Sequence, residues 1–239
     1  MQNLHSHKYY SNVFAPFKDS HVSYDDYAKR AVELGQKVVT SVEHGYQGNY
    51  LRCWETCQKY DLKFVFGVEA YWVRDRAASD DTNAHILILA RNRDGMRQIN
   101  KMLAEANKTG FYGKPRVDMA LLKTLHPPNV LITTACVSFW GKPNRQKNDK
   151  WMEGDGSNPV VWHYSDGNGS IAIDEWLGEL HDHFGSSLYL EVQAHNTPWQ
   201  KEINRHVLRL HYERKIPLIA GLDSHYIYPE QRQERQILR

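Results

Sequence analysis

The chain is poor in cysteine and has no long apolar run. Its 239 residues include three cysteines, too few for a framework of disulfide bonds. Apolar runs such as residues 86–90 are far shorter than the ~20 residues that a membrane helix needs. The N-terminal residues also lack the basic and then apolar pattern of a signal peptide. We therefore expect a protein of a reducing compartment, the cytoplasm, with no membrane partner.

The sequence also lacks an excess of charge of either sign. It has 30 Lys+Arg against 28 Asp+Glu, so its net charge is +2. Overall charge therefore does not favour a nucleic-acid binder and leaves room only for a local basic patch. Glycine-rich dinucleotide and P-loop motifs are absent, as is the Gly-x-Ser-x-Gly motif of serine hydrolases. With 41% hydrophobic residues, the composition is that of a globular protein.

Apolar runs typical of strands alternate with helical patterns along most of the chain. Strands are predicted at residues 3–5, 37–42, 63–68, 86–90, 130–135, 188–192 and 217–222. Helices are predicted at residues 23–35, 94–107, 174–184 and 197–214, and from Pro229 onward. This alternation indicates an α/β fold with a mostly parallel sheet. Seven strands favour a closed or nearly closed β/α barrel over an open doubly wound sheet.

One segment interrupts the alternation. Residues 140–170 are rich in Gly, Asn, Asp and Ser, which is typical of a long surface loop or insertion. We see no repeat and no second apolar core, so we expect a single domain over residues 1–239.

Metal-binding residue types gather where the predicted strands end. These motifs are His5-Ser6-His7, Glu43-His44, Gly67-Val68-Glu69, Ala135-Cys136 and Asp223-Ser224-His225. The carboxyl ends of barrel strands meet at one face, and side chains two apart on a strand point the same way. Imidazole, carboxylate and thiol suit Zn, Mn or Fe, and the number of donors exceeds one tetrahedral site. We therefore predict two or three divalent metals, which activate water and bind phosphoryl oxygens.

Each of these motifs also has an ordinary structural explanation when taken alone. The Asp223 motif could cap a helix, and Glu69 could form a salt bridge. Agreement between independent strand ends is what favours a metal site. The other histidines of the helices, and the Cys53–Cys57 pair with its three intervening residues, are interpreted as surface or packing residues. His195, after the sixth strand, is a further candidate near the site.

The order and spacing of these motifs resemble the PHP (polymerase and histidinol phosphatase) family along nearly the whole chain. The similarity extends to the N-terminal PHP domain of bacterial and phage-type DNA polymerase III alpha subunits. It is carried by residues 63–73, by His85 with the apolar run that follows it, and by residues 216–226 followed by Tyr228-Pro229-Glu230.

The resemblance implies a distorted seven-stranded (β/α)7 barrel with up to nine ligands and up to three metals. The implied ligands are His5, His7, His44, Glu69, His85, Cys136, Asp223 and His225, with Asp19 as the candidate ninth and His21 behind it. Two positions depart from the family pattern. Glu43 stands where the family has Asp, and His85 precedes its apolar run, which places it at the opposite end of a simple parallel barrel.

The resemblance further implies a 3′–5′ exonuclease-type phosphoesterase within a longer DNA replication polymerase. The catalytic residues would be His5, His7, His44, Glu69, Asp223 and His225, and the partners would be a DNA 3′ end and the remaining polymerase domains. Candidate phosphate contacts are Arg74, Arg76, Lys114 and Arg116. Two alternatives remain: a free-standing small-molecule phosphatase of the histidinol phosphatase type, and an inactive structural scaffold.

Overall fold

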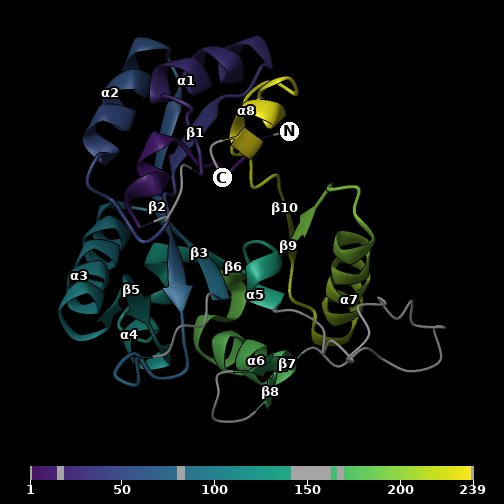
Figure 1. Cartoon of the computed structure of the whole chain (residues 1–239). Helices are drawn as coiled ribbons and strands as arrows, with labels where there is room; N and C mark the ends of the chain where they lie inside the picture. The colour runs from purple at the N-terminus through teal and green to yellow at the C-terminus, as the bar shows by residue number, and fades with distance from the viewer. Residues whose placement is uncertain (1, 15–18, 80–83, 141–162, 166–169, 238–239) are drawn as a thin grey trace.

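The computed structural model describes residues 2–14, 19–79, 84–140, 163–165 and 170–237. Within them the chain forms a mixed α/β fold (Figure 1). Most of the predicted insertion at residues 140–170 lies outside the described residues. At its C-terminal end, β7 (His163–Ser165) and β8 (Ser170–Ala172) pair as a separate antiparallel hairpin.

The main sheet contains eight of the ten strands found in the described residues. They are β1 (Val38–Ser41), β2 (Lys63–Trp72), β3 (Ala84–Ala90), β4 (Phe111–Tyr112), β5 (Lys114–Val117), β6 (Val130–Thr133), β9 (Leu188–Gln193) and β10 (Leu218–Gly221). The order is β10-β9-β6-β3-β2-β5-β4, and β1 also pairs with β2. Pairs β1/β2, β2/β5, β6/β9 and β9/β10 are parallel.

The expectation of a mostly parallel sheet is wrong at β3. This strand runs antiparallel to both of its neighbours, β2 and β6. The predicted strand at residues 3–5 is also absent, because a single bridge between Ser6 and Ser224 joins this segment to the end of β10. On the other side, the Gln2 side chain accepts hydrogen bonds from the amides of Lys37 and Val38 at the start of β1. The first segment therefore lies between the two ends of a curled sheet.

The helices cover the outside of this sheet. They are α1 (Tyr24–Glu33), α2 (Tyr50–Lys59), α3 (Arg93–Thr109), α4 (Met119–Leu122), α5 (Val137–Trp140), α6 (Ile173–Phe184), α7 (Pro198–Arg214) and α8 (Gln231–Ile237), with short 3-10 turns η1 (Tyr9–Val13), η2 (Pro127–Asn129) and η3 (Gly185–Ser187). The predicted helices are confirmed to within a few residues at their ends. Ser23 and Thr197 cap α1 and α7, each accepting a hydrogen bond from an amide in the first turn. No helix in the described part of the chain combines the length and apolar character needed to cross a membrane.

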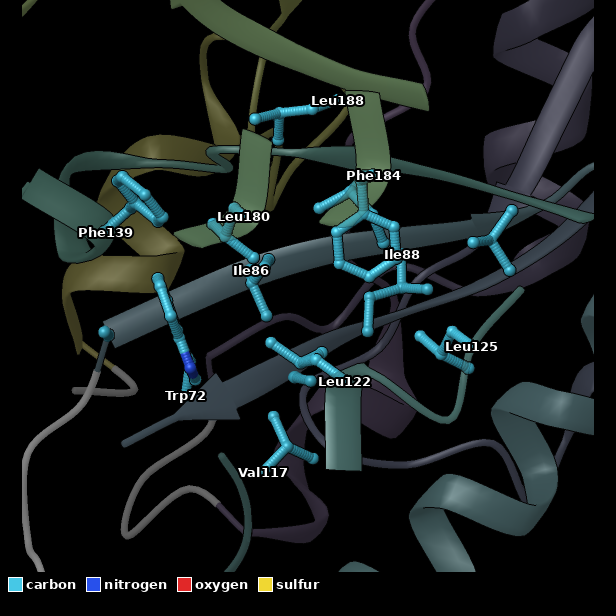
Figure 2. Close-up of a cluster of buried hydrophobic side chains, with 14 of the residues drawn as sticks. Trp72, Ile86, Ile88, Val117, Leu122, Leu125, Phe139, Leu180, Phe184 and Leu188 are labelled. Carbon is cyan, nitrogen blue, oxygen red and sulfur yellow. The ribbon is translucent and has the colours of Figure 1, made fainter. Parts of the chain in front are cut away.

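The two faces of β3 bury different cores. Ile86 and Ile88 point outward and pack with residues of the surrounding helices, such as Leu122 and Leu180 (Figure 2). Leu87 and Leu89 point inward and form a smaller cluster with Val42 and Ala135. A strand that is buried on both faces reads as a continuous apolar run, which is how this segment appears in the sequence.

A third cluster joins α1 and α2 to β1. Cys53 and Cys57 are both fully buried there, beside Ala28 and Val39. Their spacing puts them on one face of α2, where they pack as small apolar side chains.

Candidate metal centre

The nine predicted ligands meet at one end of the curled sheet. Each has a donor atom within 3.5 Å of a donor atom of another member, and the nine are His5, His7, Asp19, His44, Glu69, His85, Cys136, Asp223 and His225. We refer to these nine residues as the donor cluster. They come from segments that span the chain from its first residues to the loop after β10, so the fold alone brings them together.

Glu69 on β2 lies at the middle of the donor cluster and is fully buried. Its Oε1 is 3.2 Å from His5 Nε2, and its Oε2 is 3.2 Å from His7 Nε2 and 2.7 Å from His44 Nδ1. Burial alone would raise the pKa of this carboxyl. The surrounding imidazoles, His85 and His44 foremost, outweigh burial and hold the pKa of Glu69 well below its usual range.

The reversed direction of β3 explains the position of His85. Because β3 is antiparallel to β2, its first residues lie beside the last residues of β2, and His85 pairs with Tyr71. His85 Nδ1 is 3.1 Å from Glu69 Oε1 and 3.4 Å from Cys136 Sγ. The simple parallel barrel, which puts His85 at the far end, is therefore wrong at this strand, and His85 belongs to the donor cluster.

Three histidines direct Nε2 into the cluster and donate a hydrogen bond outward through Nδ1. His5 Nδ1 donates to Glu191 Oε1 at 2.7 Å, and His225 Nδ1 donates to the backbone oxygen of Asp223 at 2.9 Å. His7 Nδ1 donates to the Ser11 hydroxyl at 2.8 Å, and that hydroxyl donates to Glu43. Histidine ligands of metals are typically oriented by such an outward hydrogen bond, which leaves the Nε2 lone pair free for the metal.

Asp19 closes the other side of the cluster. Its Oδ2 is 2.8 Å from His225 Nε2 and 3.1 Å from His44 Nε2. Burial opposes ionisation, but hydrogen bonds from these two histidines hold the pKa of Asp19 far below its usual range. The same kind of pairing, with Glu69 and Asp19, raises the pKa of His44 to about 10 despite its burial. His21 lies elsewhere, because its ring pairs with Glu234 on α8.

The arrangement fits divalent cations. Three overlapping triads, His7/His44/His225, His5/His7/Glu69 and His44/Glu69/His85, each have ligand atoms within 4.8 Å of one another. Among the described residues, both Glu69 carboxylate oxygens and Asp223 Oδ1 are buried and contact histidine nitrogens within 3.5 Å, but none of these contacts has the geometry of a hydrogen bond. Buried carboxylates without hydrogen bonds are costly unless a cation compensates them. The mixed nitrogen, oxygen and sulfur donors suit borderline transition metals.

Sequence reasoning did not identify the residues that orient the donors. Glu191 on β9 accepts hydrogen bonds from His5, from Thr133 Oγ1 at 2.6 Å and from Gln193 Nε2 at 2.9 Å. A Cβ at Gly221 on β10 would overlap the Glu191 carboxylate, so this glycine leaves room for it. In the sequence, the only sign of this role is that two polar residues, Glu191 and Gln193, stand two apart on a strand and so point to the same face.

Of the four candidate phosphate contacts, the structure places Lys114 beside the donor cluster. Arg76 is held by the Asp118 carboxylate at 2.7 Å, and Arg116 is buried. Arg74 and His195 are exposed, unlike the donor cluster. Lys114 lies beside the cluster. Its Nζ is 4.5 Å from the centre of the Tyr71 ring, and that ring is 5.4 Å from the ring of His85.

Arg235 on the C-terminal helix α8 fixes Asp19. Its Nη2 donates to Asp19 Oδ1 at 2.7 Å and its Nε donates to the Asp19 backbone oxygen at 2.9 Å, across more than two hundred residues of sequence. These two bonds leave Oδ2 directed at His44 and His225. In Figure 1, α8 correspondingly lies beside the N-terminal part of the fold.

Arg235→Ala is therefore expected to weaken metal binding by ~10-fold or more, as loss of an orienting partner does. Titration with Mn²⁺, followed by calorimetry, measures the change. Arg232→Ala is the matched control, because Arg232 lies on the same helix and is exposed. Equal affinities for the two variants would refute a positioning role for Arg235.

Two DNA polymerase III alpha subunits are similar to the chain over most of its length. The DNA polymerase III subunit alpha of Aquifex aeolicus is 29% identical over 247 residues, covering 99% of this chain and 19% of that protein. The Helicobacter pylori subunit is 26% identical over 220 residues, covering 88% of this chain and 17% of that protein. The chain thus spans about a fifth of the length of these relatives.

Two solved structures share the fold at low sequence identity. A candidate metal-dependent phosphoesterase from Bifidobacterium adolescentis has a TM-score of 0.58 at 13% identity, covering 95% of this chain and 90% of its own. An amidohydrolase from Chromobacterium violaceum has a TM-score of 0.53 at 10% identity, covering 98% and 95%.

The family model described as PHP domain matches residues 3–195, which is well over half of the sequence. The donor cluster lies in these residues and in the loop that follows β10. The chain belongs to the PHP domain family.

Proposed function

We propose that this chain is a metal-dependent phosphoesterase domain of the 3′–5′ exonuclease type, in a DNA polymerase III alpha-like replication protein of the cytoplasm. The observation that carries the proposal is the set of three overlapping donor triads around the buried Glu69 carboxylate. One metal would need only one triad. Overlapping triads that share Glu69, His7 and His44 support a cluster of two or three divalent ions, Zn, Mn or Fe.

The nine members of the donor cluster would hold these ions: His5, His7, Asp19, His44, Glu69, His85, Cys136, Asp223 and His225. When bound, the metals supply a water of lowered pKa and positive charge for the phosphoryl oxygens. His5, His7, His44, Glu69, Asp223 and His225 form the inner part of the cluster and are the proposed catalytic residues.

The chain's own contribution is to hold the donors in place before substrate arrives. Glu191 fixes the proton of His5 on Nδ1, and the Ser11–Glu43 pair does the same for His7. Glu43 thus acts behind the donors, as a carboxylate that reaches His7 through a hydroxyl. Donors that are already oriented need little rearrangement when the phosphate binds.

The proposal extends to the architecture. Residues 2–7, which lie between β1 and β10, would take the place of the seventh strand in a distorted seven-stranded barrel. Residues 1–239 would form one domain with an insertion at residues 140–170. The polymerase relatives support a DNA 3′ end as the substrate and the other domains of a longer polymerase as partners.

His7→Ala tests the function. His7 belongs to two of the three triads, so its loss is expected to lower Mn²⁺-dependent release of nucleotides from 3′-labelled single-stranded DNA by at least ~100-fold. His126→Ala is the control, because His126 is exposed and belongs to none of the triads. If wild type and His7→Ala release nucleotides equally, the catalytic assignment is wrong.

The same assay separates the alternatives. Hydrolysis of small phosphate monoesters but not of DNA would favour a small-molecule phosphatase of the histidinol phosphatase type. A purified protein that holds less than one metal per chain and hydrolyses neither substrate would be a structural scaffold.

A further inference from the structure

We propose that the β4–β5 hairpin is a strand-binding arm of the metal centre, which stacks the bases of single-stranded DNA on Phe111 and binds its phosphates through Lys114. This inference rests on the proposed phosphoesterase function and names the element that would select a polynucleotide over a small phosphate ester. The occupant is a single nucleic-acid strand, and the argument uses the exposure, ring contacts and charge of the hairpin and its neighbours.

The hairpin presents two large aromatic side chains to solvent. Phe111 is 54% exposed and Tyr112 is 50% exposed, although neighbouring β5 is mostly buried. The register pairs Phe111 with Pro115 and Tyr112 with Lys114, and Gly113 makes the turn with a φ of 66°. Neighbouring exposed aromatic side chains on a tight hairpin are typical of an interaction site, since they gain little from the fold itself.

Phe111 belongs to a rim of three rings. Its ring centre is 6.1 Å from that of Phe14, and Phe14 is 6.4 Å from Tyr46, both in edge-to-face geometry. Tyr46 follows His44 by two residues, so the rim begins beside the donor cluster. Such rings offer flat faces on which any base can stack, independently of its sequence.

The hairpin also packs directly against the loop that carries His44. A Cβ on Gly45 would lie 3.0 Å from the Tyr71 ring and 3.1 Å from Pro115, so any other residue would push these two side chains away. Gly45 has a φ of 60°, which also favours glycine. The close packing at Gly45 therefore holds the hairpin beside the loop that carries His44.

Positive charge is held between the rim and the metal centre. Lys114 Nζ and the Arg116 guanidinium lie 4.5 Å and 5.8 Å from the centre of the Tyr71 ring. The same ring is 6.1 Å from the His44 ring and 5.4 Å from the His85 ring. Lys114 is half-buried, so its ammonium is held near the centre with part of its surface open.

Rings next to a fixed cation match the chemistry of a polynucleotide. Bases stack on the rings while the phosphates contact the cations, and both terms tolerate any sequence. A small phosphate ester could use the metals and Lys114 but would leave the rim uncovered. The hairpin would therefore contact the substrate only where that substrate continues beyond the scissile phosphate.

The test separates long from short substrates. Phe111→Ala and Lys114→Gln are expected to weaken binding of a fluorescein-labelled oligo(dT) by at least ~5-fold each, measured by anisotropy at fixed salt. Lys114→Gln is also expected to reduce the slope of log affinity against log salt concentration by about one, because one phosphate contact is lost. Hydrolysis of bis-p-nitrophenyl phosphate should change less than 2-fold in Phe111→Ala, which lies outside the donor cluster. Tyr212→Ala, on the exposed face of α7, is the matched control.

Unchanged oligonucleotide affinity in both variants would overturn the proposal. Wild-type protein that does not bind the oligonucleotide would also overturn it and would favour a protein as the occupant of the hairpin. Failure of the proposed phosphoesterase function would give a different result. Wild-type protein would then hydrolyse neither DNA nor bis-p-nitrophenyl phosphate, while anisotropy would still measure oligonucleotide binding to the hairpin.

Discussion

Glu69→Gln is expected to abolish loading of the metal centre and to reduce phosphoesterase activity by at least ~100-fold. Glutamine keeps the volume of the side chain and removes its charge. Four histidine nitrogens lie within 3.2 Å of the Glu69 oxygens, so a neutral amide there removes the anion that the metals would share. No other carboxylate in the described part of the chain contacts as many donor-cluster histidines.

Metal analysis of the purified variant measures this effect directly, and hydrolysis of a small phosphodiester gives the second readout. Glu213→Gln is the control, because Glu213 forms an exposed ion pair with Arg209 on α7. A Glu69→Gln protein that retains full metal content would show that the triads do not depend on this carboxylate.

Metal-free and metal-loaded protein are expected to respond to pH in opposite directions. In the metal-free fold, Glu69 and Asp19 raise the pKa of His44 to about 10, and nearby histidines lower the pKa of Asp19 and Asp223. The His44 contribution to stability is complete below its unfolded pKa of ~6.5 and is lost as the pH rises through 10. The carboxylate contribution is present above ~4 and is lost as the pH falls below it.

Burial, together with His44 and His225, lowers the pKa of His7, so its contribution is present above ~6.5 and is lost as the pH falls below that value. The melting temperature of metal-free protein is therefore expected to be highest near pH ~6.5 and to fall toward alkaline pH. Added metal must displace the protons from the histidines, so the stabilisation it gives should grow from pH 6 to pH 9. Thermal melts with EDTA and with Mn²⁺ across this range measure both trends. A metal-induced shift that is the same at all pH values would contradict proton displacement.

The positions of the donors could be read from the sequence, because strand ends and short-range spacing are local properties. His5 and His7 stand two apart, as do Asp223 and His225, and this spacing marked each pair as joint ligands although neither pair lies on a strand. The helices were also accessible, since Ser23 and Thr197 act as caps within a few residues of the amides they bind.

The direction of β3 could not be read in this way. A run such as Ile86–Leu89 that is buried on both faces has the same pattern in either direction. The prediction also ended the preceding strand at residue 68, whereas β2 continues to Trp72. Because β2 ends at Trp72 and β3 begins at Ala84, the connection between them is too short for the helical crossover that parallel strands need. The direction of β3 could therefore have been predicted only if the end of β2 had been predicted correctly.

The residues that orient the donors depend on contacts between distant parts of the chain. Glu191 meets His5 across 186 positions, and Arg235 meets Asp19 across 216. No local pattern distinguishes an arginine on a short helix from an ordinary surface residue. Only the folded arrangement shows which carboxylate it binds.

The same long-range contacts set the order in which the centre can be completed during synthesis. Ser6 pairs with Ser224 and Asp19 binds Arg235, so these residues find their partners only after more than two hundred further residues have been made. A nascent chain that ends before Asp223 carries most of the histidines but lacks two donors and the arginine that fixes a third. We expect metal loading to follow translation of this region.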